Sequence, residues 1–388
     1  TFRVDTQCWG TKTITVSTNP DALNTLTFTI TSAYMITLKP TQGSVTTLVV
    51  LEGVGFDADG TVTIDFGTHY TIATTTTNPS GTFSVTFIVD TQPAGYTYIT
   101  ASTENQPFKV FGANSQSTAF LITGAYITIV NPTQGAVGKQ EITVQGTGFD
   151  GSKTVRIDFG THQTITTTVS NACGTFSATF LISTQSHGTK VITAYTQTQQ
   201  ASKYYNQTED ATVYISGAYI ILVNPSQGSV STLITVKGVG FDHPDTVRID
   251  FGLTQILTTV LTTVDGTFNT TFKIDTQCYG THTITASTTN EKDITSEFFV
   301  KDPYITVLQP AIGSVSTIVT IEGVGFNNGS ATVRIDFGNT TSITTGITSP
   351  RGTFSVTFLV NTQSAGSKVI TASTGDQWAT TVFRIKAA

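Results

Sequence analysis

One seven-residue segment occurs four times in this chain. It reads TVTIDFG at residues 61–67 and TVRIDFG at 154–160, 246–252 and 332–338. In the third copy Val247, Ile249 and Phe251 alternate with Arg248 and Asp250, so apolar and polar side chains fall on opposite faces of an extended strand. Four copies of one half-buried strand predict a tandem array of β domains.

The segment belongs to a longer repeat. Each repeat opens on a tyrosine, at Tyr34, Tyr126, Tyr219 and Tyr304, and carries a GTF segment in its second half. The tyrosines are 92, 93 and 85 residues apart, and the difference in length falls in the last hairpin. A body of nearly fixed length with one variable loop is typical of a packed domain. We therefore expect domains at 34–125, 126–218, 219–303 and 304–388.

Each repeat reads as about seven short strands separated by turn residues, which predicts an all-β, immunoglobulin-like sandwich. The first strand ends at a proline, as in NPTQG, where a strand end or sheet edge is expected. Phe56, Phe66, Phe83 and Phe87, with counterparts in the other repeats, are the expected core. Burying each phenylalanine contributes about 1.5–3 kcal/mol, so no cross-link is needed for stability.

Residues 1–33 match only the second half of a repeat, because Thr1 aligns with Thr86. A half sandwich exposes its core face and should not fold alone. We expect either that the chain is a fragment of a longer polypeptide or that another copy supplies the missing strands. Very short connections such as ITGAYI predict an extended, semi-rigid rod of domains.

Composition excludes several classes of function. Charged residues are only 11% of the chain, and 83 threonines, about a fifth of it, suit the wet face of a sheet. A net charge of −6 without a basic cluster argues against a nucleic-acid partner. No apolar run approaches the roughly 20 residues of a membrane span. Cys8 and Cys278 occupy the same repeat position, so together with Cys173 they are expected to be free thiols.

The succession Pro–x–x–Gly, ITVxGxGF, VxIDFG, GTFSxTF and GTxxITA resembles the IPT/TIG class of immunoglobulin-like sandwich. More closely, it is similar to the tandem repeats of large prokaryotic surface proteins, including surface-layer proteins and adhesins. The resemblance covers the whole chain. It implies an extracellular or cell-surface location and a structural role, whereas modules of this class also accompany secreted enzymes and receptors.

Catalytic chemistry finds little support in the residues. His69 and His162 share a GTH turn, but Leu253 and Asn339 stand there in the third and fourth repeats. No serine or cysteine lies in a recognisable nucleophile motif. We therefore expect no enzymatic activity and no cofactor.

Other candidate sites lie in turns and loops. Acidic pairs, Asp57 with Asp59 and Asp242 with Asp245, offer hard oxygen ligands for calcium, or simply form solvated turns. Possible glycosylation sites are Asn206, Asn269, Asn328 and Asn339. Aromatic residues in the long last hairpins, Phe108, Phe111, Tyr204 and Tyr205, favour contact with a partner, or fold back on their own sheet.

The sequence thus predicts a structural, non-enzymatic extracellular protein that self-associates into a surface layer, sheath or filament through loops or edge strands. One alternative is an adhesin stalk or a carbohydrate-binding array that contacts a cell-surface glycan. Another is an accessory region of a secreted enzyme.

Overall fold

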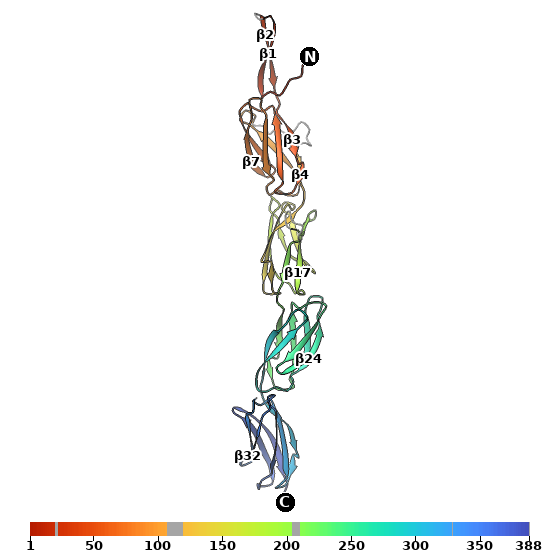
Figure 1. Ribbon diagram of the computed structural model, residues 1–388, viewed down its shortest axis with the longest axis vertical. Helices are drawn as coiled ribbons and strands as arrows, with labels where there is room; N and C mark the ends of the chain where they lie inside the picture. The colour runs from red at the N-terminus through yellow and green to blue at the C-terminus, as the bar shows by residue number, and fades with distance from the viewer. Residues whose placement is uncertain (20–21, 107–118, 204–209, 328, 388) are drawn as a thin grey trace. The chain divides into compact units, whose positions relative to one another are not determined.

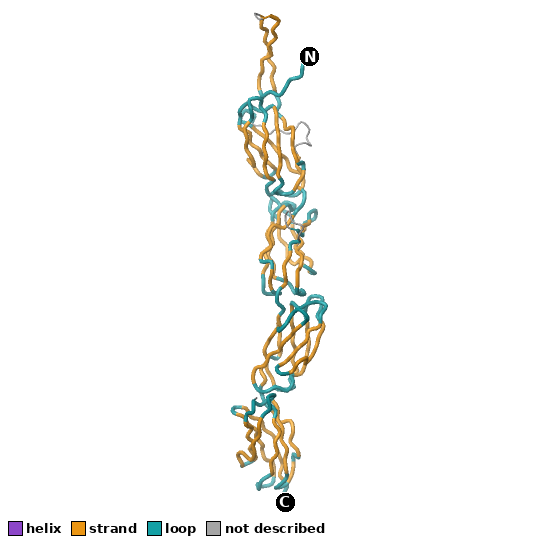
Figure 2. The backbone as a smooth tube through the Cα atoms, in the orientation of Figure 1, coloured by secondary structure: helices purple, strands orange, loops and turns teal. Residues whose placement is uncertain are grey.

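The computed structural model describes residues 1–19, 22–106, 119–203, 210–327 and 329–387. Within these ranges the chain forms strands, turns and loops without a helix, as Figure 2 shows. It divides into two compact units. Unit 1 comprises Thr1–Thr133, Glu141–Leu181 and Thr189–Val213, and unit 2 comprises Gln134–Gln140, Ile182–Gly188 and Tyr214–Ala388.

The first repeat, in unit 1, forms two sheets (Figure 1). The first has the order β3 (Tyr34–Lys39), β5 (Leu48–Val54), β8 (Phe83–Ile88). The second has the order β4 (Gln42–Gly43), β10 (Ala119–Ile122), β9 (Gly95–Ser102), β6 (Thr61–Phe66), β7 (His69–Thr76).

The third and fourth repeats, in unit 2, have the same two sheets. In the third they are β20 (Tyr219–Asn224), β22 (Leu233–Val239), β25 (Phe268–Lys273), and β21 (Gln227–Gly228), β27 (Ile294–Val300), β26 (Gly280–Ser287), β23 (Thr246–Phe251), β24 (Thr254–Leu261). In the fourth they are β28 (Tyr304–Gln309), β30 (Ile318–Val324), β33 (Phe354–Leu359), and β29 (Ile312–Gly313), β35 (Gln377–Ile385), β34 (Gly366–Thr374), β31 (Thr332–Phe337), β32 (Thr340–Ile347).

The second repeat has counterparts of these strands. In unit 1, β11 (Tyr126–Asn131), β13 (Glu141–Thr147) and β16 (Phe176–Leu181) form one sheet, and β14 (Thr154–Phe159) pairs with β15 (His162–Val169) and β17 (Gly188–Tyr195). The short strand β18 (Gln200–Ala201) pairs with β17, and β12 (Gln134–Gly135) pairs in parallel with β19 (Thr212–Ile215).

These sheets confirm the predicted fold class of tandem immunoglobulin-like β-sandwiches. The opening strand ends before the proline, as expected, but the chain then contributes a two-residue strand to the other sheet. In the first repeat this strand, β4, pairs in parallel with β10. Among the described strands, the threonine-rich fourth strand, β7, pairs with β6 alone. The division of the chain into domains at the opening tyrosines stays a prediction.

Phenylalanine rings fill the core between the two sheets. In the first repeat Phe56 and Phe66 are fully buried and Phe83 and Phe87 nearly so, as the sequence predicts. Phe56 meets Phe83 edge to face with ring centroids 5.1 Å apart, and the equivalent pair in the third repeat has the same separation. Such edge-to-face pairs add about 0.5–1.5 kcal/mol to the stabilisation from burial.

Gly238 is the glycine on which this ring pair depends in the third repeat. A side chain at Gly238 would collide with the rings of Phe268 and Phe241. A glycine inside a strand marks either a bulge or a close approach of another group to the backbone, and here the structure shows the close approach. The glycine lets two rings pack directly against the strand.

A glutamine side chain fixes the turn after the TVxIDFG strand in the first, third and fourth repeats. In the first repeat Gln92 is fully buried, and its Nε2 donates to the Phe66 carbonyl at 3.1 Å. Its Oε1 accepts the Thr68 backbone N–H at 3.0 Å. Gln277 in the third repeat makes the equivalent bonds to Phe251 and Leu253. The side chain thereby satisfies main-chain groups that the turn leaves without strand partners.

The aspartate of each TVxIDFG strand accepts a hydrogen bond from a backbone N–H of the strand that follows. Asp250 Oδ1 accepts the backbone N–H of Ile256 at 2.7 Å, where β24 has a left-handed residue (φ 52°) and the pairing with β23 shifts register. Asp250 also binds Arg248 at 2.6 Å. The hydrogen bond from Arg248, the largest influence, outweighs burial and lowers the pKa of the Asp250 carboxyl. The carboxylate therefore anchors a β-bulge as well as pairing with a charge.

Candidate functional site

The N-terminal hairpin has two unlike faces. It consists of β1 (Gly10–Asn19) and β2 (Ala22–Ile30), paired antiparallel in a sheet of two strands. On one face threonines stand opposite threonines, at positions 11, 13 and 15 and at 29, 27 and 25. On the other face Ile14 stands opposite Leu26, and Phe28 stands opposite Lys12.

The apolar face of the hairpin is exposed where its counterpart in a complete repeat is buried. Val16, Leu26 and Phe28 are 51%, 67% and 42% exposed. In the third repeat β26 and β27 correspond to this hairpin, and Ala286 and Phe298, at the positions of Val16 and Phe28, are fully buried. The face therefore carries core-type side chains that no other described part of residues 1–388 covers.

The hairpin is attached to the first repeat within unit 1. The Trp9 backbone N–H donates to the Phe56 carbonyl at 2.9 Å. The Cα of Cys8 lies so close to Gly81 that a side chain at Gly81 would overlap it. The same backbone hydrogen bond links Ala94 to Phe149 in unit 1, and His187 to Phe241 and Tyr279 to Phe326 in unit 2.

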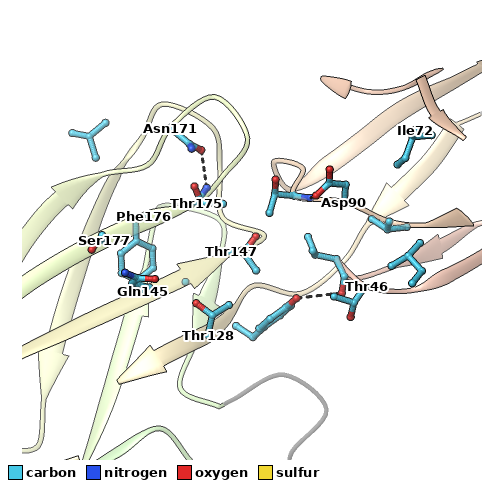
Figure 3. Close-up of a pocket in the computed structure, with 17 residues that line it drawn as sticks. Thr46, Ile72, Asp90, Thr128, Gln145, Thr147, Asn171, Thr175, Phe176 and Ser177 are labelled. Atoms are coloured by element: carbon cyan, nitrogen blue, oxygen red, sulfur yellow. Dashed lines mark hydrogen bonds between the residues drawn. The ribbon is translucent and has the colours of Figure 1, made fainter. Parts of the chain in front are cut away.

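A groove of about 850 Å³ lies in unit 1 (Figure 3). Thr128, Gln145 and Thr147 line it, and the Tyr126 hydroxyl at its edge donates to the Val45 carbonyl at 3.3 Å. Asp90 is the only charged side chain among its lining residues. The equivalent positions of the fourth repeat line a smaller hollow. The groove is therefore a consequence of the repeat, and its lining offers no acid–base pair for catalysis.

Three exposed tyrosines surround a second hollow, of about 410 Å³, in the first repeat. Tyr70, Tyr96 and Tyr98 are 78%, 73% and 57% exposed and line this hollow together. The equivalent residues of the fourth repeat are Thr341, Ser367 and Val369, so the trio is particular to the first repeat. The sequence reasoning missed it, although the pattern GYTY in place of GTK or GSK was the available signal.

A histidine and two acids gather in unit 2. His187 Nδ1 lies 3.2 Å from Asp242 Oδ1, and His187 Nε2 lies 3.0 Å from Glu291 Oε1. The Tyr214 hydroxyl lies 3.0 Å from the same Nε2, and the two rings meet edge to face. Among the residues that the structure describes, His187, Asp242 and Glu291 are the three whose potential metal-binding atoms lie within 4.8 Å of one another.

The predicted calcium pairs occupy separate positions in their turns. Asp57 is buried and accepts the Asn105 backbone N–H at 3.2 Å, whereas Asp59 is exposed. Asp245 accepts the Thr289 backbone N–H at 3.0 Å, the largest cause of the lowered pKa of its carboxyl. Asp242 turns instead toward His187. Calcium binding by either pair stays a prediction.

Several other candidates cannot be placed. Phe108, Phe111, Tyr204 and Tyr205, and two possible glycosylation sites, Asn206 and Asn328, lie outside the described residues. Asn269 and Asn339 are exposed, so glycosylation of these two remains sterically possible.

Cys8, Cys173 and Cys278 take part in no disulfide within the described ranges. In those same ranges no helix has the length and apolar character to cross a membrane.

No protein-family model and no curated protein matches this chain. Solved structures with similar features include a tetra-tandem repeat from the extending region of a large adhesion protein, 12% identical over 92% of this chain and 100% of that one, with a TM-score of 0.26. Invasin, a bacterial integrin-binding protein, is 15% identical over 91% and 78% of the two chains, with a TM-score of 0.24. The BSP domain of a biofilm-associated protein is 11% identical over 92% and 96%, with a TM-score of 0.19.

TM-scores this far below 0.5 do not establish a common fold over the whole length. The class of the protein, tandem immunoglobulin-like sandwiches, is therefore defined by the strand order of its own sheets.

Proposed function

We propose that this chain is a structural, non-enzymatic component of an extracellular array, such as a surface layer, sheath or filament, and that copies join through the N-terminal hairpin. The observation that carries the proposal is the set of core-type side chains on β1 and β2, which no other described part of residues 1–388 covers, and a second copy is one source of that cover. The resemblance to IPT/TIG-like repeats of prokaryotic surface proteins supports an extracellular location. Exposed core-type side chains in contiguous patches favour a protein partner.

A second copy of the hairpin is a suitable partner, because two such apolar faces together restore the two layers of a sandwich. Full burial of a valine, leucine or phenylalanine contributes about 1.5–3 kcal/mol, and roughly half of that remains available at Val16, Leu26 and Phe28. The three side chains of one copy therefore offer about 3 kcal/mol. Micromolar association requires about 8 kcal/mol, so the face of the second copy and edge-strand hydrogen bonds must supply the rest.

The test compares the full chain with a variant carrying Leu26→Thr and Phe28→Thr. We expect the chain to form dimers or larger assemblies with rising concentration, and the variant to associate about 10- to 100-fold more weakly. Light scattering coupled to size-exclusion chromatography measures the mass, and electron microscopy of native material shows whether copies repeat in contact. A variant with Thr27→Ala and Thr29→Ala, on the opposite face of β2, is the matched control and should associate as the parent does.

A monomer at every concentration, in both the parent and the hairpin variant, would remove the proposed role of this face. Equal weakening by the hairpin variant and the threonine-face control would also contradict it, because the effect would then not depend on the apolar side chains.

The alternative function, an adhesin stalk or a carbohydrate-binding array, is favoured by Tyr70, Tyr96 and Tyr98. Exposed tyrosines present rigid apolar surface with hydroxyl groups at its edge, which suits contact with sugar rings. A glycan array probed with the monomeric chain tests it. Binding that is lost with Tyr96→Ser and Tyr98→Ser, and kept with the hairpin variant, would favour this alternative over assembly.

A further inference from the structure

We propose that His187, Asp242 and Glu291 form a binding site for a divalent transition-metal ion, with Zn²⁺ as the best match. All three residues belong to unit 2. His187 lies in the turn before β17, Asp242 directly follows the buried Phe241, and Glu291 lies in the loop between β26 and β27. The backbone N–H of His187 donates to the Phe241 carbonyl at 3.1 Å, so the main chain itself holds the imidazole beside Asp242.

The distances suit a metal ion. Asp242 Oδ1 lies 3.2 Å from His187 Nδ1 and Glu291 Oε1 lies 3.0 Å from His187 Nε2, so the two carboxylates face different ring nitrogens. One ligand atom from each residue nevertheless lies within 4.8 Å of the others, and a tetrahedral ion about 2.0–2.2 Å from nitrogen and oxygen ligands separates those ligands by about 3.3–3.6 Å. A single ion takes one of the two nitrogens, so the carboxylate that faces the other nitrogen must turn toward the ion to complete the set.

Burial and charge also favour a cation. The side chains of His187, Asp242 and Glu291 are only 20%, 17% and 11% exposed. The two carboxylates place a charge of −2 in this enclosed site, which is unfavourable away from water. A divalent ion neutralises that charge completely. An imidazolium would neutralise only half of it.

A break in the repeat pattern points to the same site independently. In the other three repeats the residue after the core phenylalanine binds a residue at or just beyond the end of the ITA strand. Asp57 accepts from Asn105, Asp150 accepts from Thr196 and Thr198, and the amide of Asn327 donates to Thr374.

Asp242 departs from this pattern, since its Oδ1 faces His187 instead. Its Oδ2 is buried without a hydrogen-bond partner among the described residues. A buried carboxylate oxygen with an open coordination position is what a metal ligand requires.

The residue types are also particular to this place. Trp9, Ala94 and Tyr279 occupy the position of His187 in the other turns of this kind, so none of those turns has an imidazole there. One imidazole with two carboxylates is a borderline donor set that suits Zn²⁺ and its neighbours among the transition metals. Calcium prefers six to eight oxygen ligands, a larger set than these three residues offer.

The test is a calorimetric titration of the metal-free full chain with Zn²⁺ alone, Ca²⁺ alone and Mg²⁺ alone. We expect one Zn²⁺ per chain, with much weaker binding of the other two ions. Glu291→Gln and Asp242→Asn keep the side-chain shape and should each weaken Zn²⁺ binding at least about 10- to 100-fold, the range that even outer-shell partners cause. Amide exchange at His187 should slow when Zn²⁺ is added, because the ion would hold its turn against Phe241.

His282→Gln is the matched control, because His282 Nε2 lies 3.7 Å from the Cys278 thiol and both groups are of the types that bind Zn²⁺. This control should bind Zn²⁺ as the parent does. Loss of binding in the control but not in Glu291→Gln would overturn the proposal, as would no Zn²⁺ binding by the parent. Tighter binding of Ca²⁺ than of Zn²⁺ would overturn the choice of metal. Amide exchange in the fourth repeat verifies that each variant is folded.

Discussion

Replacing Gln92 should destabilise the first repeat through the main-chain groups that this side chain satisfies. The replacement is Gln92→Met, which keeps the volume of the side chain and removes its hydrogen bonds. Gln92 Nε2 donates to the Phe66 carbonyl at 3.1 Å and its Oε1 accepts the Thr68 N–H at 3.0 Å. His69 Nδ1 lies 2.7 Å from the same Nε2.

The magnitude follows from where these groups lie. Phe66 is fully buried, so its carbonyl loses a partner that water cannot easily replace, at about 1–3 kcal/mol. Thr68 is exposed, so its N–H can turn to water, at about 0.5–1 kcal/mol. The total is about 1.5–4 kcal/mol. At about 1.4 kcal/mol for each factor of ten, amides of β6 and β9 that exchange by unfolding of the repeat should exchange about 10- to 1,000-fold faster.

Residue-resolved hydrogen exchange is the suitable assay, because a chain of several domains does not unfold in one step. The slow amides of β6 and β9 report on the first repeat, and those of β31 and β34 provide an internal reference in the fourth. An acceleration of less than about threefold in the first repeat would refute the reasoning, because it would show that the turn holds without the glutamine. Equal acceleration of amide exchange in both repeats would also contradict it, because the effect would then not be confined to the repeat that contains Gln92.

Three further outcomes follow from the third repeat. Phe251→Ala removes a fully buried ring and should lower the free energy of unfolding of the third repeat by about 3–5 kcal/mol, measured by hydrogen exchange of its core amides. A decrease below about 1 kcal/mol would mean that this ring is not essential to the core. Gly238→Ala forces Phe268 and Phe241 apart and should cost about 1–3 kcal/mol by the same measurement; an unchanged rate would contradict the close packing. The pKa of the Asp250 carboxyl is lowered in the folded state, chiefly by the hydrogen bond from Arg248, so its stabilisation is complete above about pH 4 and is lost as pH falls below that value. Urea midpoints between about pH 5 and pH 2 should therefore decline less steeply for Asp250→Asn than for the parent, and identical slopes would count against the interaction.

Most of the fold could be predicted from the sequence because period-2 alternation states directly which side chains face the core. Val247, Ile249 and Phe251 are fully buried as that alternation requires. The short parallel strand after the proline could not be predicted, because a two-residue pairing leaves no periodic signal. Buried Gln92 was missed for a different reason: polar residues read as surface unless their partners are known, and its partners are main-chain groups 24 and 26 residues earlier.

The sites were harder to predict than the sheets. Asp242 was selected as a possible ligand, but as a partner of Asp245 in the same turn. Its actual neighbours, His187 and Glu291, are far from it in sequence and come together only through the fold. The apolar face of the hairpin, in contrast, was predictable from alignment alone, because residues 1–33 match the second half of a repeat and carry its core-type side chains.

The hydrogen bond from the turn residue to the core phenylalanine carbonyl uses only main-chain atoms. Trp9, Ala94, His187 and Tyr279 all make it, although their side chains range from a methyl group to an indole ring. A substitution at this position therefore changes the side chain and leaves the main-chain hydrogen bond in place. New chemistry can be introduced at any single junction without redesigning the sandwiches on either side, and protein engineers could exploit the same freedom by transplanting a ligand set from one junction to another.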